Sequence, residues 1–217
     1  MLMTKEEHRS LILLISLLLF LVLVPVLRND RISELALVFS LYIVMIAATV
    51  ELAGKRGFQH IGIPLVAISM ILIFVGYLHP SVPWVIAYYS MLVLFLGVVS
   101  AGLFSYLGRP GSINNGRLYG SVSLYFILAL FWFAIYSVID TIYPAAFLEA
   151  GVSQVTHVPR AALLYFSLET LTTLGYGDIV PIHPLARMLA ALEAATGILY
   201  IAITVSRLVA AFQRAEK

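Results

Sequence analysis

The residues best suited to chemistry in this chain lie between Thr170 and Pro181, where the sequence reads T-L-T-T-L-G-Y-G-D-I-V-P. Gly175 and Gly177 alternate there with residues that carry side chains. Glycine adopts left-handed backbone angles without steric cost, so glycines at alternate positions allow successive carbonyl oxygens to point to one side. A row of such oxygens can replace the water around a bare cation. We therefore expect an ion-binding segment made of main-chain oxygens.

The run T-T-L-G-Y-G-D resembles the selectivity filter of the tetrameric potassium channels, with one departure at Leu174, where valine is usual. The resemblance implies a filter that comprises Thr173, Leu174, Gly175, Tyr176, Gly177 and Asp178. Potassium would bind to the hydroxyl of Thr173 and to the carbonyls of Thr173, Leu174, Gly175 and Tyr176. The alternative interpretation is a glycine-rich extracellular turn between two spans, which leaves the spacing of these residues unexplained.

The composition is that of an integral membrane protein. The 217 residues are 62% hydrophobic and 11% charged, with a mean hydropathy of +1.02, far from the values of soluble domains. The net charge of +2 is too small to indicate nucleic-acid binding, and the chain has no cysteine. The histidines are scattered and no nucleophile is paired with a base, so we expect neither an enzyme nor a cofactor other than permeant potassium ions.

Apolar runs long enough to cross a bilayer predict an all-α transmembrane fold with six spanning helices. The runs are 10–27, 35–52, 61–78, 84–103, 119–143 and 185–207. A shorter apolar segment, 159–172, precedes the filter and fits a re-entrant pore helix, because non-helical backbone at membrane depth must line a water-filled path or be buried in protein. We expect a four-helix transmembrane domain at 1–104, a linker at 105–118 and a pore domain at 119–217.

The basic residues predict the orientation in the cell membrane. With the N- and C-termini in the cytoplasm, nine lysines and arginines lie inside and four outside, as the positive-inside tendency requires. The inside set is Lys5, Arg9, Lys55, Arg56, Arg109, Arg117, Arg207, Arg214 and Lys217, and the outside set is Arg28, Arg31, Arg160 and Arg187. This orientation places the filter on the extracellular side. Membrane lipids and other copies of the chain are the partners we expect.

A single filter sequence in the chain predicts a homotetramer, because the resembled family forms its pore from four filter strands around one axis. In that assembly Tyr176 would pack outward against the pore helix, near Tyr165 or Phe166, and so set the width of the filter. Tyr165 and Phe166 taken alone fit core or interfacial aromatic packing equally well.

Two acidic residues accompany the filter, Glu169 in the predicted pore helix and Asp178 beyond the second glycine. Some prokaryotic potassium channels have the same E-T-x-T-T-x-G-Y-G-D arrangement, and this resemblance implies that the two carboxyls share a proton behind the filter. Two adjacent carboxylates ionise together only at high cost, so one would stay protonated near neutral pH. The alternative is that Glu169 bonds only to backbone, without coupling to conduction.

Gly197 lies twenty positions beyond Gly177, where the resembled family often has a gating glycine in its inner helix. Glycine inside a helix costs about 1 kcal/mol relative to alanine. Two explanations stay open for it, a hinge and close helix packing. Glu193, one turn earlier on the same face, either bonds a neighbouring helix or influences the charge of the central cavity.

We expect the four-helix domain to carry no gating charges, because no Asp, Glu, Lys or Arg occurs from Gly57 through Gly108, a range that includes the third and fourth spans. We therefore expect six spans without voltage sensing by arginines. Pro110-Gly111 and Asn114-Asn115-Gly116 should interrupt the connector 105–118. About ten residues follow Arg207, too few for a cytosolic sensor domain.

Passive, potassium-selective conduction is the function that these features favour. The alternative is the membrane subunit of a larger potassium uptake or regulatory assembly that depends on a cytosolic partner.

Overall fold

The structure is a computed structural model that describes residues 4–26, 31–52, 58–78, 81–108, 114–151 and 157–215. Helices dominate these ranges, and two short strands lie next to the predicted filter. In chain order the elements are α1 (Lys5–Val26), α2 (Arg31–Leu52), α3 (Phe58–Leu78), α4 (Val82–Leu107), α5 (Asn115–Ile142), β1 (Phe147–Glu149), α6 (Arg160–Leu171), β2 (Ile179–Pro181) and α7 (Pro184–Ala215).

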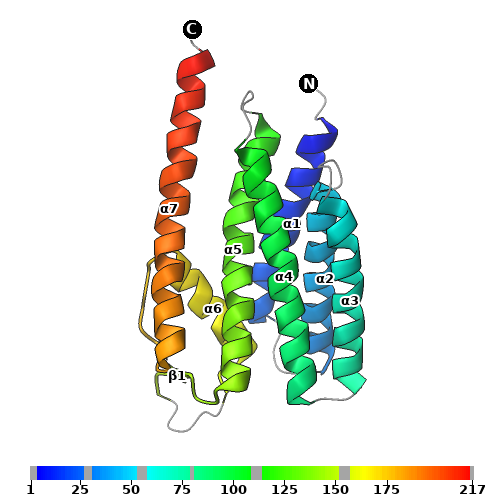
Figure 1. The fold of residues 1–217 in the computed structure, drawn as a ribbon, viewed down its shortest axis with the longest axis vertical. Helices are drawn as coiled ribbons and strands as arrows, with labels where there is room; N and C mark the ends of the chain where they lie inside the picture. The colour runs from blue at the N-terminus through cyan, green and yellow to red at the C-terminus, as the bar shows by residue number, and fades with distance from the viewer. Residues whose placement is uncertain are drawn as a thin grey trace.

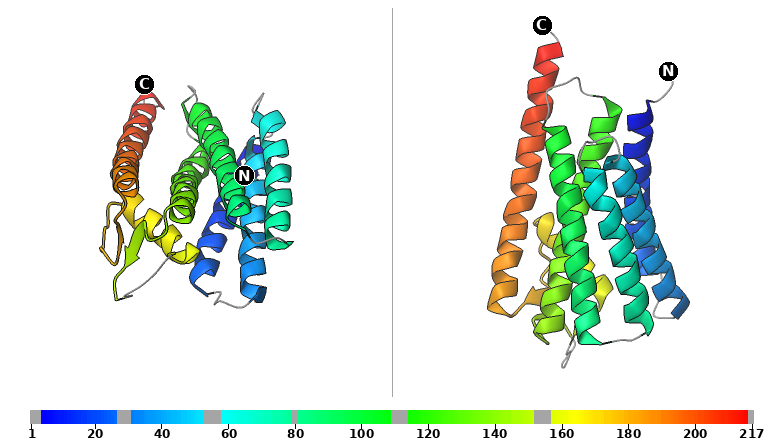
Figure 2. Two further views of the ribbon diagram at one scale, coloured as in Figure 1. Left: turned by 60° about the horizontal axis from the view of Figure 1, so that its bottom comes forward. Right: turned by 45° about the vertical axis from the view of Figure 1, so that its right-hand side comes forward.

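The long helices run alternately along the molecule's long axis, so that α1 begins and α7 ends at the same end of the molecule (Figure 1). The short helix α6 lies near the opposite end, together with β1. Figure 2 shows α5 and α6 between α7 on one side and the group α1 to α4 on the other. The elements that surround the predicted filter are therefore gathered at the end opposite the termini.

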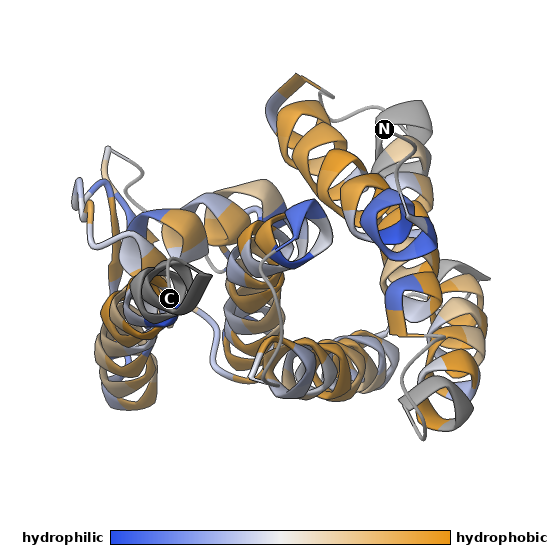
Figure 3. Ribbon diagram, turned by 90° about the horizontal axis from the view of Figure 1, so that it is seen from above, coloured by the Kyte–Doolittle hydropathy of each residue, from blue (hydrophilic) through white to orange (hydrophobic). Residues whose placement is uncertain are grey.

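The helices consist largely of apolar residues, as the colouring of Figure 3 shows, and many large apolar side chains are exposed. Exposed examples include Ile15 on α1, Ile43 on α2, Ile71 on α3 and Leu94 on α4. An apolar surface of this extent does not occur on soluble monomers. The chain is a largely helical membrane protein.

Four helices are long and apolar enough to cross a membrane within the described ranges, namely α1, α4, α5 and α7. The apolar parts of α2 and α3 are shorter, at Val38–Leu52 and Ile61–Gly76. Four of the six predicted spans are thus long, apolar helices, and α2 and α3 form helices at the other two.

Helix α5 forms the centre of the core. In its most apolar stretch of 18 residues, 61% of the residues are buried inside the single chain, against 11% in the corresponding stretch of α7. It packs on α1 and α4 on one side and on α6 and α7 on the other. At its outer end, Tyr136 contacts the rings of Phe147 and Phe166, which also contact each other. The pore helix therefore rests on an aromatic core, and Phe166 is a core residue.

The helices differ from the predicted runs mainly by extending beyond them, because polar and charged residues continue a helix outside the apolar layer. The prediction that Asn115 and Gly116 interrupt the connector was wrong. Both belong to the first turn of α5, where the side chain of Asn114 accepts a hydrogen bond from the Arg117 N–H at 2.9 Å. An asparagine at this position caps a helix rather than breaking it.

Some predicted features lie outside the described residues. These are Pro110-Gly111 and the charges of Arg28, Lys55, Arg56, Arg109 and Lys217.

The two strands were not predicted. They pair in antiparallel fashion, with Phe147 opposite Pro181 and Glu149 opposite Ile179. The hairpin continues at both ends, because the Ala150 N–H donates to the Asp178 carbonyl at 2.7 Å and the Ile182 N–H donates to the Ala146 carbonyl at 2.8 Å. This pairing fastens the segment after the predicted filter to the segment after α5.

Candidate ion pathway

The filter segment begins where α6 stops, inside the molecule rather than at its end. The helix was predicted at 159–172 and is observed at Arg160–Leu171. Its last carbonyls are occupied by the turn that follows: the Thr172 N–H donates to Leu168, the Thr173 N–H to Thr170 and the Leu174 N–H to Glu169, at 2.8 to 3.1 Å. These bonds fix the direction in which the chain leaves the helix.

The backbone angles of the filter alternate. Thr173, Gly175 and Gly177 have positive φ angles of 59°, 58° and 76°, whereas Leu174 and Tyr176 between them do not. Glycine accepts such angles readily, but a β-branched threonine does so rarely and at some cost. The positive φ angles therefore fall at the alternate positions where the sequence has Gly175 and Gly177, with Thr173 before them, and the use of these carbonyls for ion binding stays a prediction.

The whole segment 172–178 is exposed in the single chain. Tyr176 is 70% exposed and Leu174 is 55% exposed, so their side chains find little packing in their own chain. Packing of Tyr176 near Tyr165 or Phe166 therefore stays a prediction for an assembly of several chains.

Glu169 supports the filter from behind. Its side chain is buried, with 3% exposed, and its Oε2 atom accepts a hydrogen bond from the Tyr176 N–H at 3.1 Å. Burial raises the pKa of the Glu169 carboxyl, the Tyr176 N–H opposes the shift, and the charge of Asp178 adds to it. Tyr165 interacts with both carboxyls. Among the described residues, no hydrogen bond joins Glu169 to Asp178 directly, and Tyr165 lies close to both carboxyls.

Gly197 touches the end of the pore helix. A Cβ atom built on Gly197 would lie 1.9 Å from the carbonyl oxygen of Leu171 and 2.9 Å from its carbonyl carbon, distances that no side chain tolerates. The same oxygen accepts a hydrogen bond from the hydroxyl of Tyr125 at 3.2 Å. The sequence left a hinge and close helix packing open as explanations for Gly197. The contact with Leu171 favours close packing.

Glu193 bonds two neighbouring helices. Its Oε2 atom accepts a hydrogen bond from the Tyr136 hydroxyl of α5, and its Oε1 atom lies within hydrogen-bond distance of the Ser167 hydroxyl of α6. The residue is fully buried in the single chain. Of the two roles open for Glu193, the bond to a neighbouring helix is the one that the contacts display.

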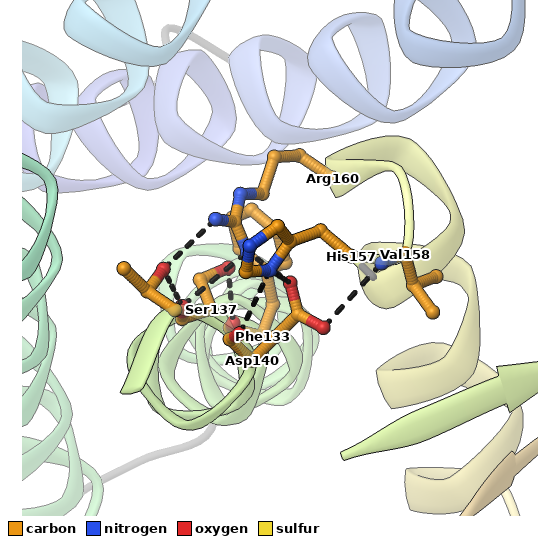
Figure 4. Close-up of polar contacts among 7 residues, drawn as sticks. Phe133, Ser137, Asp140, His157, Val158 and Arg160 are labelled. Atoms are coloured by element: carbon orange, nitrogen blue, oxygen red, sulfur yellow. Dashed lines mark hydrogen bonds and ion pairs between the residues drawn. The ribbon is translucent and has the colours of Figure 1, made fainter. Parts of the chain in front are cut away.

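A polar cluster that sequence reasoning missed ties α5 to the start of α6 (Figure 4). Asp140 is fully buried. Its Oδ2 atom lies 3.2 Å from Arg160 and 3.3 Å from His157, and its Oδ1 atom accepts the Val158 N–H at 3.4 Å. The guanidinium of Arg160 also lies over the ring of Tyr89 on α4, 5.2 Å from its centre. The sequence feature that could have indicated this cluster is Asp140 itself, a single acidic residue within an apolar run.

The described residues contain no group of three His, Asp or Glu side chains that could hold a metal ion. Main-chain oxygens and the Thr173 hydroxyl are the ion-binding candidates that the sequence predicted there. A short helix followed by an exposed segment with alternating backbone angles fits the pore-forming part of an ion channel.

Comparison with known proteins agrees with this class. Residues 120–214 match the family described as "Ion channel". The inward rectifier potassium channel Kirbac3.1 of Paramagnetospirillum magnetotacticum is 35% identical over 88 residues, which make up 41% of this chain and 25% of that protein. The potassium voltage-gated channel protein shk-1 of Caenorhabditis elegans is 35% identical over 102 residues, 45% of this chain and 18% of that protein.

The matched part therefore covers a quarter or less of these relatives' length. No solved structure matches the chain. Segment 120–214 of the chain is therefore similar to ion channels, and the two relatives that it resembles are potassium channels.

Proposed function

We propose that four copies of this chain form a channel that conducts potassium passively and selectively. The observation that carries the proposal is the alternation of positive φ angles at Thr173, Gly175 and Gly177 directly after the pore helix. Carbonyls of Thr173, Leu174, Gly175 and Tyr176, with the Thr173 hydroxyl, would replace the hydration shell of the ion. Because the ligands are backbone oxygens, Leu174 in place of valine leaves them unchanged.

The exposure of the filter and of α7 supports a homotetramer. One filter segment cannot surround an ion, and residues 172–178 are exposed in the single chain, which leaves them free to contact other copies. Only 11% of the residues in the most apolar stretch of α7 are buried in the single chain, although this helix lies next to the candidate filter. In a ring of four chains α7 would line the central cavity and pack on its neighbours.

Six spans follow if α2 and α3 also cross the bilayer. They have 22 and 21 residues, and at about 1.5 Å per residue each is long enough for a hydrocarbon core of about 30 Å. The termini would then lie in the cytoplasm and the filter outside the cell. The location of both ends of the described chain opposite the filter supports this orientation in the plasma membrane (Figure 1).

Glu169 and Asp178 would hold one proton between them, with Tyr165 as the bridging group. The buried carboxyl of Glu169 already bonds the Tyr176 N–H, so its protonation state bears directly on the filter backbone. Gating by voltage through charged residues of α4 has no basis here, because Val82–Leu107 contains no Asp, Glu, Lys or Arg. A membrane potential acts only on charge that can move.

Ion flux into liposomes that contain only the purified chain tests the proposal. We expect potassium flux well above sodium flux, and loss of flux in Gly175→Ala, because a side chain at a φ of +58° strains the filter. Gly151→Ala is the matched control: it also has a positive φ, of +84°, with open space around it, but it lies outside the filter.

Equal potassium and sodium flux, or a conducting Gly175→Ala variant, contradicts the proposal. The alternative function, a subunit of a larger uptake or regulatory assembly, requires instead that the chain alone be silent and that flux appear only with a cytosolic partner.

A further inference from the structure

The junction at Glu193 joins the three helices of the candidate pore. Within it, the Tyr136 hydroxyl donates to Glu193 Oε2 at 2.5 Å, and the Ser167 oxygen lies 2.5 Å from Glu193 Oε1. The Ser167 oxygen also lies 2.7 Å from the carbonyl oxygen of Ala129. All these side chains are buried. Within the described part of the chain, no lysine, arginine or histidine forms an ion pair with Glu193.

Counting protons decides the state of this carboxyl. A serine hydroxyl has one proton to donate, yet the Ser167 oxygen lies at bonding distance from two oxygens. If Glu193 were ionised, both of those oxygens would be acceptors only, and one contact of 2.5 or 2.7 Å would join two oxygens without a proton. If Glu193 carries a proton, it donates to the Ser167 oxygen, Ser167 donates to Ala129, and every contact is satisfied.

We propose that Glu193 is a neutral carboxylic acid whose proton links the inner helix α7 to the pore helix α6. The structure assigns it as a positioning residue: it is fully buried in the single chain, and it acts on the candidate filter through Ser167, two positions before Glu169. Its role in conduction rests on the proposed channel function, but its protonation does not. Gly197, one turn further along α7, abuts Leu171 at the end of the same pore helix, so the two residues fasten α7 to α6 at adjacent turns.

Among the residues that the structure describes, no positive charge next to Glu193 favours the ionised form. Helix α5 presents the phenols of Tyr136 and Tyr125 toward Glu193. Helix α6 presents Ser167, and its acidic residue Glu169 bonds the Tyr176 N–H instead. An anion here would lack a cationic partner and would lose the contact to Ser167, since burial of an unpaired charge is costly. The link between α6 and α7 is therefore expected to weaken as the pH rises.

Glutamine reproduces the neutral acid closely, which makes Glu193→Gln the deciding variant. Its amide N–H₂ can donate to Ser167 and its carbonyl can accept from Tyr136, as the protonated carboxyl does. Glu193→Ala removes both contacts. In infrared difference spectra of the purified wild-type protein in lipid, we expect the carbonyl band of a protonated carboxylic acid that is absent from Glu193→Gln and present in Glu169→Gln.

We expect the thermal midpoint of Glu193→Gln to lie within about 2 °C of wild type and that of Glu193→Ala to fall by about 5–10 °C. Wild-type stability should decline at alkaline pH, whereas that of Glu193→Gln should not. The proposal is overturned if the spectra contain no protonated carboxyl band that depends on Glu193. It is also overturned if Glu193→Gln is as unstable as Glu193→Ala. If Glu193→Gln does not fold, Tyr136→Phe must keep the band, because it leaves the proton in place. Failure of potassium flux in the wild type would refute the channel function without affecting these spectra.

Discussion

Replacement of Gly197 by alanine separates the two roles that a glycine can have in the inner helix. The added Cβ atom would lie 1.9 Å from the Leu171 carbonyl oxygen, whereas real Cβ contacts essentially never fall below 3.0 Å. Restoring that separation requires α7 and the end of α6 to part by about 1.1 Å, the difference between these two distances. A backbone oxygen cannot rotate away as a flexible side chain would, so the helices themselves must move.

Two effects of opposite sign determine the outcome. Alanine improves helix propensity over glycine by about 1 kcal/mol, and overpacking costs about 1–3 kcal/mol or more. With a backbone atom in the way, the upper part of that range applies, and the net loss is about 2 kcal/mol. In a chain of this size such a loss lowers the thermal midpoint by about 4–8 °C.

Thermal unfolding of the purified protein in detergent, with Gly97→Ala as control, measures this effect. Gly97 lies in the middle of α4, and the nearest atom to its added Cβ is a ring carbon of Phe131 at 3.5 Å, an ordinary contact. Gly97→Ala should match or exceed wild-type stability. If Gly197→Ala behaves like Gly97→Ala, the packing argument is refuted. If Gly197→Ala is as stable as wild type and changes the open probability of the channel, Gly197 acts as a hinge.

Three further predictions concern the filter and its outer support. Leu174→Val should leave the preference for potassium unchanged and alter the open-state lifetime in single-channel records, because a β-branched residue favours extended backbone; equal lifetimes would remove the idea. Since burial raises the pKa of Glu169, its loss of a proton should occur at higher pH than for an ordinary glutamate, and inactivation should change over that range in wild type but not in Glu169→Gln. Asp140→Asn should destabilise the protein by about 2 kcal/mol, because Arg160 loses its charged partner, whereas Glu149→Gln in thermal unfolding should have little effect.

The sequence predicted the pore region closely because its signals are local. Glycines at alternate positions and a short apolar segment before them are features of consecutive residues, and the predicted helix 159–172 differs by one residue at each end from Arg160–Leu171. Long apolar runs likewise predicted where helices lie. The strands β1 and β2 have three residues each, too few for a pattern of alternating side chains to be recognised.

Features that depend on tertiary contacts could not be predicted. The sequence allowed two roles for Gly197 and two for Glu193, and only the position of Leu171 and Ser167 on another helix distinguishes between them. Asp140 was missed for the same reason. Its partners His157 and Arg160 are 17 and 20 positions away, and nothing in the apolar run around Asp140 indicates that they return to it.

Helix α4 contacts the pore region with aromatic rings where a voltage sensor would need charges. The guanidinium of Arg160, at the start of the pore helix, lies 5.2 Å from the ring centre of Tyr89, and that of Arg207 on α7 lies 5.2 Å from the ring centre of Phe104. The charges belong to the pore helices and the rings to α4, so a membrane potential has no charge on α4 to displace. Any effect of α4 on these two helices would therefore have to act through packing, because its two rings, 15 positions apart, contact Arg160 at the start of α6 and Arg207 of α7.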